Sequence, residues 1–138
     1  MASSATPYVW SLILSFAALL ISIILLYAAR FSARLEVKDL AALRSMFDRF
    51  PAWGKRASWA QQNSFEAFAM HAPAALLAVV AVLNGHALPG IAVAVALAHP
   101  VLRVAYISAY ILKVPIARAV AWFLGLLCSG ILYGVGLE

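Results

Sequence analysis

A group of polar side chains lies in the predominantly apolar segment 55–83, and three of them are the first candidates for chemistry. Gln62, Asn63 and Glu66 lie on or near one face of a helix, because residues three and four positions apart are neighbours there. An amide and a carboxylate on one face can hold a polar ligand by hydrogen bonds. Ionisable residues inside membrane-spanning segments are candidates for function.

A second group of polar side chains lies in the apolar segment 88–113. Arg103, Tyr106 and Tyr110 stand at positions i, i+3 and i+7, which again places them on one helical face. A guanidinium with two phenols is suited to binding an anion or a polar group. The two faces together predict a polar cavity lined by Asn63 and both tyrosines.

Both charges lie deep in their segments. Arg103 is ten residues before Lys113, or about 15 Å along a helix, and Glu66 is eleven residues after Lys55. An isolated charge at that depth costs several kcal/mol, so we predict a Glu66–Arg103 ion pair between the second and third spans. The pair either only fixes the helix register or forms the floor of a cavity open to the cytoplasm.

The elements that position these residues follow from composition. Of 138 residues, 66% are apolar and only 11% are charged, against about 25% in soluble domains, so the bilayer must be the solvent. A spanning helix needs about 20 apolar residues. The chain therefore predicts an all-α membrane protein, an antiparallel bundle of four transmembrane helices forming one domain over 1–138. The expected spans are 8–29, 55–83, 88–113 and 116–137.

Basic residues are concentrated between the first two spans. The segment 30–56 holds seven of them: Arg30, Arg34, Lys38, Arg44, Arg49, Lys55 and Arg56. Lys113 and Arg118 flank the third loop, whereas the second loop and the N-terminal segment have none. The positive-inside rule then predicts cytoplasmic first and third loops and both termini outside. The basic segment also favours contact with anionic headgroups of the lipid bilayer.

The middle of that segment has an amphipathic pattern. Leu35, Leu40, Leu43 and Phe47 recur at roughly helical spacing and predict a short helix lying at the membrane interface. The net charge of +5 does not indicate a nucleic-acid partner, because no aromatic and basic platform stands outside the membrane.

Two further sets of residues bear on ligands and assembly. The three histidines lie on different elements without ligand spacing, so no metal site is predicted: His71, His86 and His99. The glycines of the fourth span predict a small-residue face suited to close helix contact, which favours a bundle and an oligomer: Gly125, Gly130, Gly134 and Gly136.

Three motifs, taken in order, resemble a known family. Arg56-Ala57-x5-Asn63-x2-Glu66 resembles the second-helix signature of the MAPEG superfamily, membrane-associated proteins in eicosanoid and glutathione metabolism. Arg103-x2-Tyr106-x3-Tyr110-x2-Lys113 resembles its third-helix signature. Arg118-x3-Trp122-x2-Gly125 resembles the start of its fourth helix in bacterial members. The resemblance covers about 8–137, and the order and spacing of the motifs make it specific.

The resemblance implies a homotrimer in a bacterial inner membrane, with glutathione as co-substrate between neighbouring subunits near the cytosolic face. In catalytic members an arginine stabilises the glutathione thiolate, which attacks a lipophilic electrophile or hydroperoxide. The chemistry suits the environment, since a nearby guanidinium lowers the pKa of a thiol from about 8.5.

The resemblance also assigns roles by position. The residues that match cavity or glutathione-contacting positions are Gln61, Asn63, Glu66, Arg103, Tyr106 and Tyr110. The activating arginine is Arg118 or one of Arg30 and Arg34, with Arg118 preferred because it begins a helix at the cytoplasmic mouth.

One position departs from the pattern. Members that use glutathione commonly carry an arginine four residues before the asparagine, where this chain has Trp59, and Arg56 is one turn away to cover the gap. Retention of the other positions favours a glutathione-dependent transferase or peroxidase. Trp59 favours a non-catalytic protein that binds a lipid or quinone-like small molecule, or a partner subunit of a membrane complex.

Overall fold

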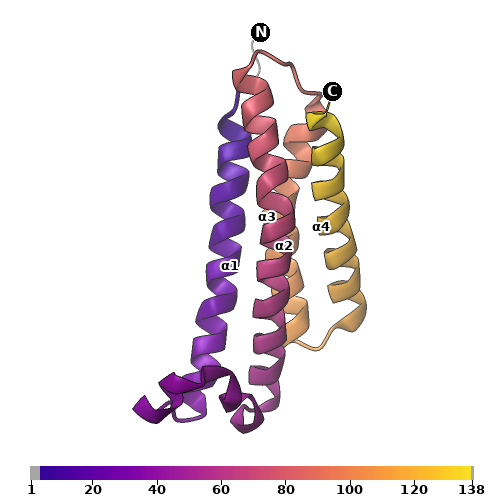
Figure 1. Ribbon diagram of the computed structural model, residues 1–138. Helices are drawn as coiled ribbons and strands as arrows, with labels where there is room; N and C mark the ends of the chain where they lie inside the picture. Colours follow the sequence, from indigo (N-terminus) through magenta and orange to yellow (C-terminus); the bar gives the residue numbers. More distant parts are fainter. Residues whose placement is uncertain (1–3, 138) are drawn as a thin grey trace.

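Four long helices account for most of the protein. The computed structural model describes residues 4–137 (Figure 1). Its helices are α1 (Thr6–Ser32), α2 (Ala52–Leu83), α3 (Gly90–Ile111) and α4 (Pro115–Gly136), and two short 3₁₀ helices, η1 (Val37–Ala41) and η2 (Leu43–Arg49), lie between α1 and α2. Each α-helix is long and apolar enough to cross a membrane. The predicted all-α, four-span membrane fold is confirmed.

The helices form an antiparallel bundle. α2 packs against α1 and α4, α3 packs against the same two helices, and α1 and α4 lie on opposite sides of the α2–α3 pair (Figure 1). We call the end where α1 begins and α4 ends the terminal end, and the end with η1 and η2 the loop end. A proline lies at the start of α2, α3 and α4: Pro51, Pro89 and Pro115. The first residues of a helix have no partner within the helix for a backbone N–H, so the N–H that proline lacks is not missed there.

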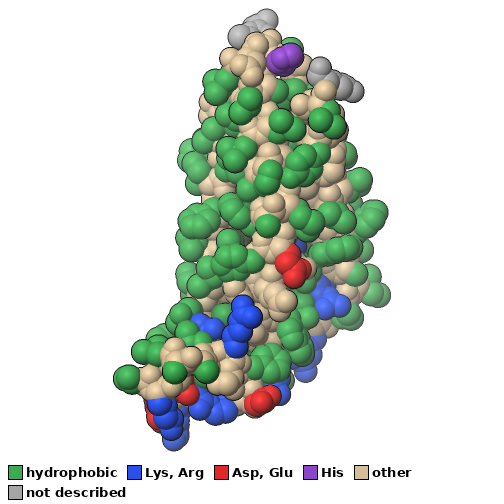
Figure 2. All heavy atoms as spheres, in the orientation of Figure 1, with side chains coloured by type: hydrophobic (Ala, Val, Ile, Leu, Met, Phe, Trp, Pro, Cys, Tyr) green, Lys and Arg blue, Asp and Glu red, His purple; other side chains and the backbone are tan. Residues whose placement is uncertain are grey.

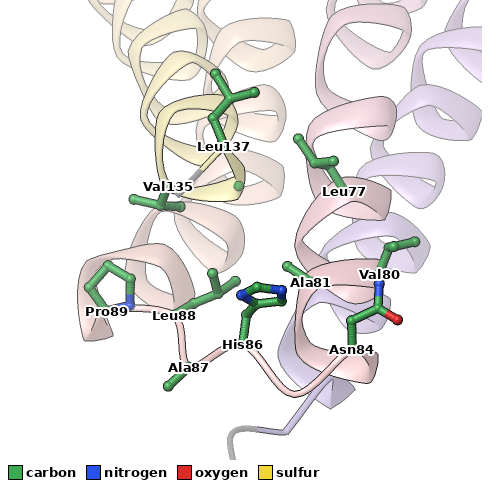
Figure 3. A pocket seen from close by; sticks show the side chains of 11 residues that line it. Leu77, Val80, Ala81, Asn84, His86, Ala87, Leu88, Pro89, Val135 and Leu137 are labelled. Carbon is green, nitrogen blue, oxygen red and sulfur yellow. The ribbon is translucent and has the colours of Figure 1, made fainter.

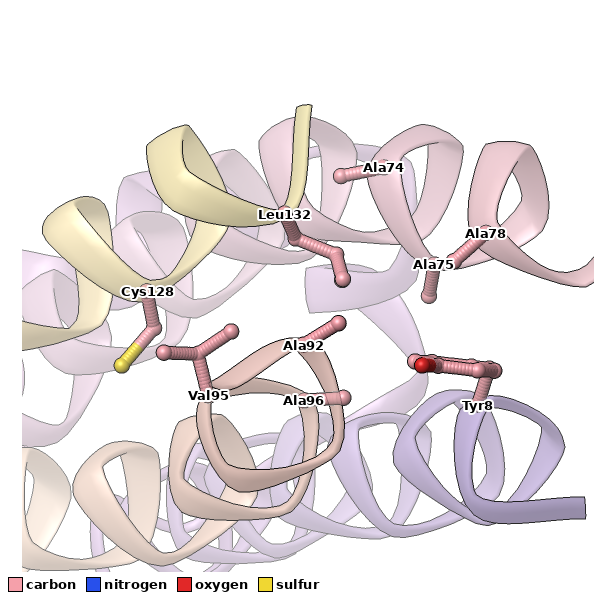
Figure 4. Packing of buried hydrophobic residues seen from close by; sticks show 9 residues of the cluster. All are labelled: Tyr8, Ala74, Ala75, Ala78, Ala92, Val95, Ala96, Cys128 and Leu132. Carbon is pink, nitrogen blue, oxygen red and sulfur yellow. The ribbon is translucent and has the colours of Figure 1, made fainter. Parts of the chain in front are cut away.

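Small side chains fill the core near the terminal end. Nine buried residues from all four helices point toward one another (Figure 4): Tyr8, Ala74, Ala75, Ala78, Ala92, Val95, Ala96, Cys128 and Leu132. Alanine lets helix backbones approach closely, which is how transmembrane helices gain packing energy. The four helices are therefore closely packed at this cluster.

The glycines of α4 do not share one face, contrary to the prediction. Gly125 is buried toward His99 and Arg103, and Gly136 packs against Leu77. At Gly130 and Gly134 a Cβ atom would meet no atom of another helix within 4 Å among the described residues, so both face open space. The reason is the rotation of about 100° per residue, which places Gly130 and Gly134, five and nine residues after Gly125, on the other side of the helix.

The segment between α1 and α2 differs from the predicted amphipathic α-helix. It forms η1 and η2, separated at Ala42, whose φ of −152° and ψ of 67° interrupt the helix. Leu43 and Phe47 pack against the buried Met46 and Phe50, but Leu40 is turned outward. Of the predicted apolar face, only Leu40 is therefore turned away, because Leu35 also packs against this cluster.

One ion pair holds this segment together. Arg49 donates from Nη2 to Oδ2 of Asp39 at 2.8 Å, and the backbone N–H of Glu36 donates to the same oxygen at 2.9 Å. The hydrogen bond from Arg49 is the main cause that lowers the pKa of the Asp39 carboxyl, and the bond from the Glu36 N–H lowers it further. The contact with Asp39 also raises the pKa of Arg49. Both partners are therefore charged at neutral pH.

The charged side chains gather at the loop end. On the face drawn in Figure 2, Lys, Arg, Asp and Glu occupy the lower half, and hydrophobic side chains cover the upper half. The apolar surface suits lipid contact, and the charged end suits headgroups and water.

Candidate functional site

Arg103 lies at the centre of the candidate site. It comes from α3, is only 4% exposed, and donates from Nη2 to Oδ1 of Asn63 on α2 at 2.8 Å. Its guanidinium carbon lies 4.2 Å from the ring centroid of Tyr106, a cation–π distance. The predicted grouping of Asn63, Arg103 and Tyr106 is therefore present in the structure.

The predicted Glu66–Arg103 ion pair is wrong. Within residues 4–137 the ion pairs are Lys38–Glu36 and Arg49–Asp39, and Glu66 is exposed on the outer face of α2. α2 packs mainly on α1 and α4, and the side of it that faces Arg103 carries Asn63 and Ser64, whose hydroxyl lies 3.5 Å from Nη2 of Arg103. The amide satisfies a donor of Arg103 but leaves its positive charge without a carboxylate in the described chain.

A row of aromatic and basic residues leads from Arg103 to the loop end. The rings of Tyr106 and Tyr110 lie 5.7 Å apart, and the guanidinium carbon of Arg118 lies 4.6 Å from the Tyr110 ring. Arg56 donates to the carbonyl of Ile111 at 3.3 Å. A hollow of about 270 Å³ between α2, α3 and α4 is lined by Arg56, Tyr110 and Arg118, among others.

The remaining predicted residues lie in a different cavity. Arg30, Gln61 and Glu66 line a space of about 660 Å³ between α1, α2 and η2. Arg30 is 9% exposed, its guanidinium carbon lies 4.6 Å from the Tyr27 ring, and its Nε has no hydrogen-bond partner among residues 4–137. The protomer thus carries two groups of polar residues on two faces.

Trp59 lies between the two groups. Its ring is 5.5 Å from that of Phe47, on the side of the larger cavity, and 6.4 Å from that of Tyr110, on the side of the hollow. Trp59 is 47% exposed, so it presents an aromatic surface where the related family commonly has an arginine.

A polar network in the middle of the bundle was not predicted from the sequence. The imidazoles of His71 on α2 and His99 on α3 stack in parallel at 3.6 Å between ring centroids, and both are fully buried. Ser11 and Ser15 of α1 are their hydrogen-bonding partners. The sequence signal that could have revealed this network is the pair of serines four residues apart in an apolar span, together with two histidines inside other spans.

The hydrogen bonds of His71 and Ser11 together connect all four helices. Ser11 donates to the carbonyl of Ala96 at 2.6 Å, so its oxygen accepts from Nε2–H of His71 at 2.7 Å. On the other side of the ring, Nδ1 lies 3.0 Å from the hydroxyl of Ser129 on α4. Among the described residues no group of three metal-ligating side chains converges here or elsewhere.

A further hollow, of about 380 Å³, lies at the terminal end. Figure 3 shows His86 and Asn84 beside apolar side chains of α2, α4 and the 84–89 loop, including Leu77, Leu88 and Val135. None of the residues predicted for glutathione lines it. The candidate chemistry therefore lies in the half of the bundle nearer the loop end.

Comparison with known proteins gives a match to a protein-family model. The model of the MAPEG family matches residues 8–137, which include almost all of the four helices and every residue of the two polar groups. No curated protein and no solved structure matches the chain.

Proposed function

This chain belongs to the MAPEG family, the integral membrane proteins of glutathione and eicosanoid metabolism, and we propose that it is a glutathione-dependent transferase or peroxidase acting on lipophilic electrophiles or hydroperoxides. The observation that carries the proposal is the buried guanidinium of Arg103, which has an amide but no carboxylate partner among residues 4–137. A buried charge without a counter-ion is costly. An anionic ligand such as glutathione would compensate it.

The residues near Arg103 suit a thiol nucleophile. Glutathione supplies carboxylates for arginines and a thiol whose anion is the reactive form. In the proposed site Arg103 and Asn63 hold a polar part of the tripeptide, and Arg118, beside Tyr110 at the start of α4, stabilises the thiolate. Tyr106 and Tyr110 give the site aromatic walls that limit the access of water.

We further propose that the site is completed between protomers of a homotrimer. Gln62 and Glu66 are exposed on a membrane-spanning helix, where polar groups facing lipid are disfavoured. A neighbouring copy would cover them with the side that carries its own Arg103 group, so that Arg30 and Gln61 of one protomer meet the Arg103 group of the next. In this arrangement one domain, 1–138, spans a bacterial inner membrane with both termini outside.

Glutathione titration into detergent-purified protein tests the proposal. The wild type should bind, and Arg103→Leu should lose about tenfold to a hundredfold in affinity, because a hydrogen bond to a charged group contributes about 1.5–3 kcal/mol. Lys38→Gln, which removes an exposed charge far from the site, is the matched control and should bind normally. Failure of the wild type to bind would reject glutathione as co-substrate.

The second candidate is a non-catalytic lipid- or quinone-binding scaffold, or a partner subunit of a membrane complex. The row of Phe47, Trp59 and Tyr110 favours it, because an aromatic surface at this point suits an apolar ligand better than a carboxylate. Turnover of an aromatic electrophile or of a hydroperoxide with glutathione separates the candidates. The enzyme requires turnover, whereas the scaffold predicts none.

A further inference from the structure

An exposed apolar face stands out at the loop end. Val37 and Leu40 are 85% and 61% exposed, and both belong to η1. In a 3₁₀ helix, side chains at i and i+3 are eclipsed, so these two lie one above the other on a single face. Neither packs against the buried cluster of Met46 and Phe50.

This face is held by an ordered segment. The Asp39–Arg49 pair and the Glu36 N–H bond to Asp39 fix η1 against η2. η2 in turn packs on α1 through Met46, Leu26 and Ala29. In Figure 1 the segment extends sideways from the foot of α1 rather than continuing the bundle. The exposed apolar pair is thus a fixed feature of the loop end.

The same segment carries an excess of positive charge. Residues 30–56 hold seven Lys and Arg against three Asp and Glu. Within the described chain, Glu36 pairs with Lys38 and Asp39 with Arg49, while Arg34 and Arg44 form no ion pair and are exposed. Unpaired guanidinium groups therefore flank the apolar face.

We propose that η1 and its flanking cations form a docking platform for an anionic phospholipid leaflet, with Val37 and Leu40 inserted at the headgroup–acyl boundary and Arg34, Lys38 and Arg44 on the headgroups. The argument is charge complementarity combined with position. The platform lies where α1 ends and α2 begins, so the bilayer surface is already next to it. An apolar pair flanked by cations matches the layered chemistry of such a leaflet.

The platform is separate from the proposed glutathione chemistry but adjoins it. Leu43, Arg44 and Phe47 of η2 line the larger cavity together with Arg30. Docking of η1 would therefore hold one wall of that cavity in place. The inference does not depend on whether glutathione binds.

Depth measurement in lipid nanodiscs is the first test. In a Cys128→Ser background, an environment-sensitive fluorophore is attached at Leu40→Cys, with Ala41→Cys as the matched control from the same helix. In nanodiscs containing phosphatidylglycerol, spin-labelled lipids should quench the label at position 40 at least severalfold more than the label at 41. Equal quenching at both positions would overturn the proposal.

Charge variants provide an independent test that does not use the label. The thermal unfolding midpoint is compared in phosphatidylcholine nanodiscs and in nanodiscs with phosphatidylglycerol, for wild type, for the combined Arg34→Gln, Lys38→Gln and Arg44→Gln variant, and for Lys113→Asn. Wild type and Lys113→Asn should gain stability in the anionic lipid, and the triple variant should lose most of that gain. A triple variant with the full gain, or a wild type with none, would contradict anionic-lipid docking.

Discussion

At the scale of single residues, the decisive feature is the partner of Arg103. The charge of Glu66 and its depth in the membrane predicted that it would pair with Arg103, but Asn63 is the residue that accepts a hydrogen bond from Arg103. An amide accepts a hydrogen bond without neutralising the cation, so the electrostatic cost of burial is only partly offset. A structural ion pair would have neutralised Arg103, whereas the observed arrangement leaves it without a carboxylate partner among residues 4–137.

Substitution of Trp59 tests the position at which the resemblance implies an arginine. Trp59→Arg should tighten glutathione binding by about tenfold to a hundredfold, because it adds a hydrogen bond to a carboxylate. Arg56→Ala in the native background should abolish the residual binding. Calorimetric titration of both variants measures this. If Trp59 serves an apolar ligand, Trp59→Arg will lose thermal stability and gain no glutathione affinity.

Acidification should weaken the Asp39–Arg49 pair and so destabilise the segment between α1 and α2. The pKa of Asp39 is lower in the folded state, so its contribution to stability is complete above the ordinary carboxyl pKa of about 4 and is lost as pH falls through the folded-state value. Hydrogen exchange of 36–50 should therefore accelerate as pH falls below about 4, relative to exchange in α3 after correction for intrinsic rates. Asp39→Asn should show the faster exchange already at pH 7. Unchanged protection of 36–50 in that variant would contradict a role for the Asp39–Arg49 pair.

At the scale of elements, the histidine network ties the helices in register. His71 of α2 bonds serines of α1 and α4, and Ser11 also bonds the backbone of α3. These bonds connect helices that otherwise meet mainly through small apolar side chains. Polar bonds of this kind between transmembrane helices contribute about 0.6 kcal/mol on average and up to about 1.7.

Two buried serines of α1 provide a matched comparison of that contribution. Ser11→Ala removes two interhelical bonds and leaves a buried imidazole N–H without its partner, so unfolding free energy should fall by about 1–3 kcal/mol. Ser22→Ala removes only a bond to Leu19 of its own helix and should cost less than about 1 kcal/mol. Denaturant unfolding in detergent gives both values. Equal losses would mean that the network does not hold the helices.

At the scale of the whole molecule, the two polar groups face different sides of one protomer. Arg30 and Gln61 line one cavity, and Arg56, Tyr110 and Arg118 line the other. A cyclic assembly brings two different faces of identical subunits together at every interface. The proposed trimer would therefore form three equivalent sites from these halves.

Mixed assemblies test that arrangement. As homo-oligomers, Arg30→Ala and Arg103→Leu protomers should each bind glutathione about tenfold to a hundredfold more weakly than wild type, so that their sites stay empty at a concentration that fills the wild-type sites. Co-expressed in equal amounts, they should recover about a quarter of the sites, because random mixing pairs two intact halves at that fraction of the interfaces. Glutathione stoichiometry on the purified mixture measures the recovery. No recovery, with assembly intact by mass, would place the whole site within one protomer.

The orientation in the membrane is a separate prediction for the whole chain. Lys and Arg cluster at the loop end, so this end should be cytoplasmic and both termini should lie outside. Fusions of a cytoplasm-active reporter and a periplasm-active reporter after residue 138 and within 33–50 test it. A C-terminal reporter active only in the cytoplasm would reverse the assignment.

The sequence by itself determined the membrane fold, the four spans and the location of the charges. Apolar runs of the length of a bilayer permit no other regular structure, because a helix alone satisfies its backbone bonds within one segment. It also determined which residues share a helical face, as for Asn63 and Glu66, or for Arg103, Tyr106 and Tyr110, since the rotation per residue is fixed.

Only the tertiary structure decided which faces meet. α2 lies between α1 and α4, so Asn63 rather than Glu66 reaches Arg103, and Arg30 lies away from Arg118. The stacking of His71 on His99 depends on the same packing. Helical periodicity fixes angles within one helix, whereas the rotation of each helix against its neighbours depends on how side chains of different helices fit together, and that fit is a property of the bundle as a whole.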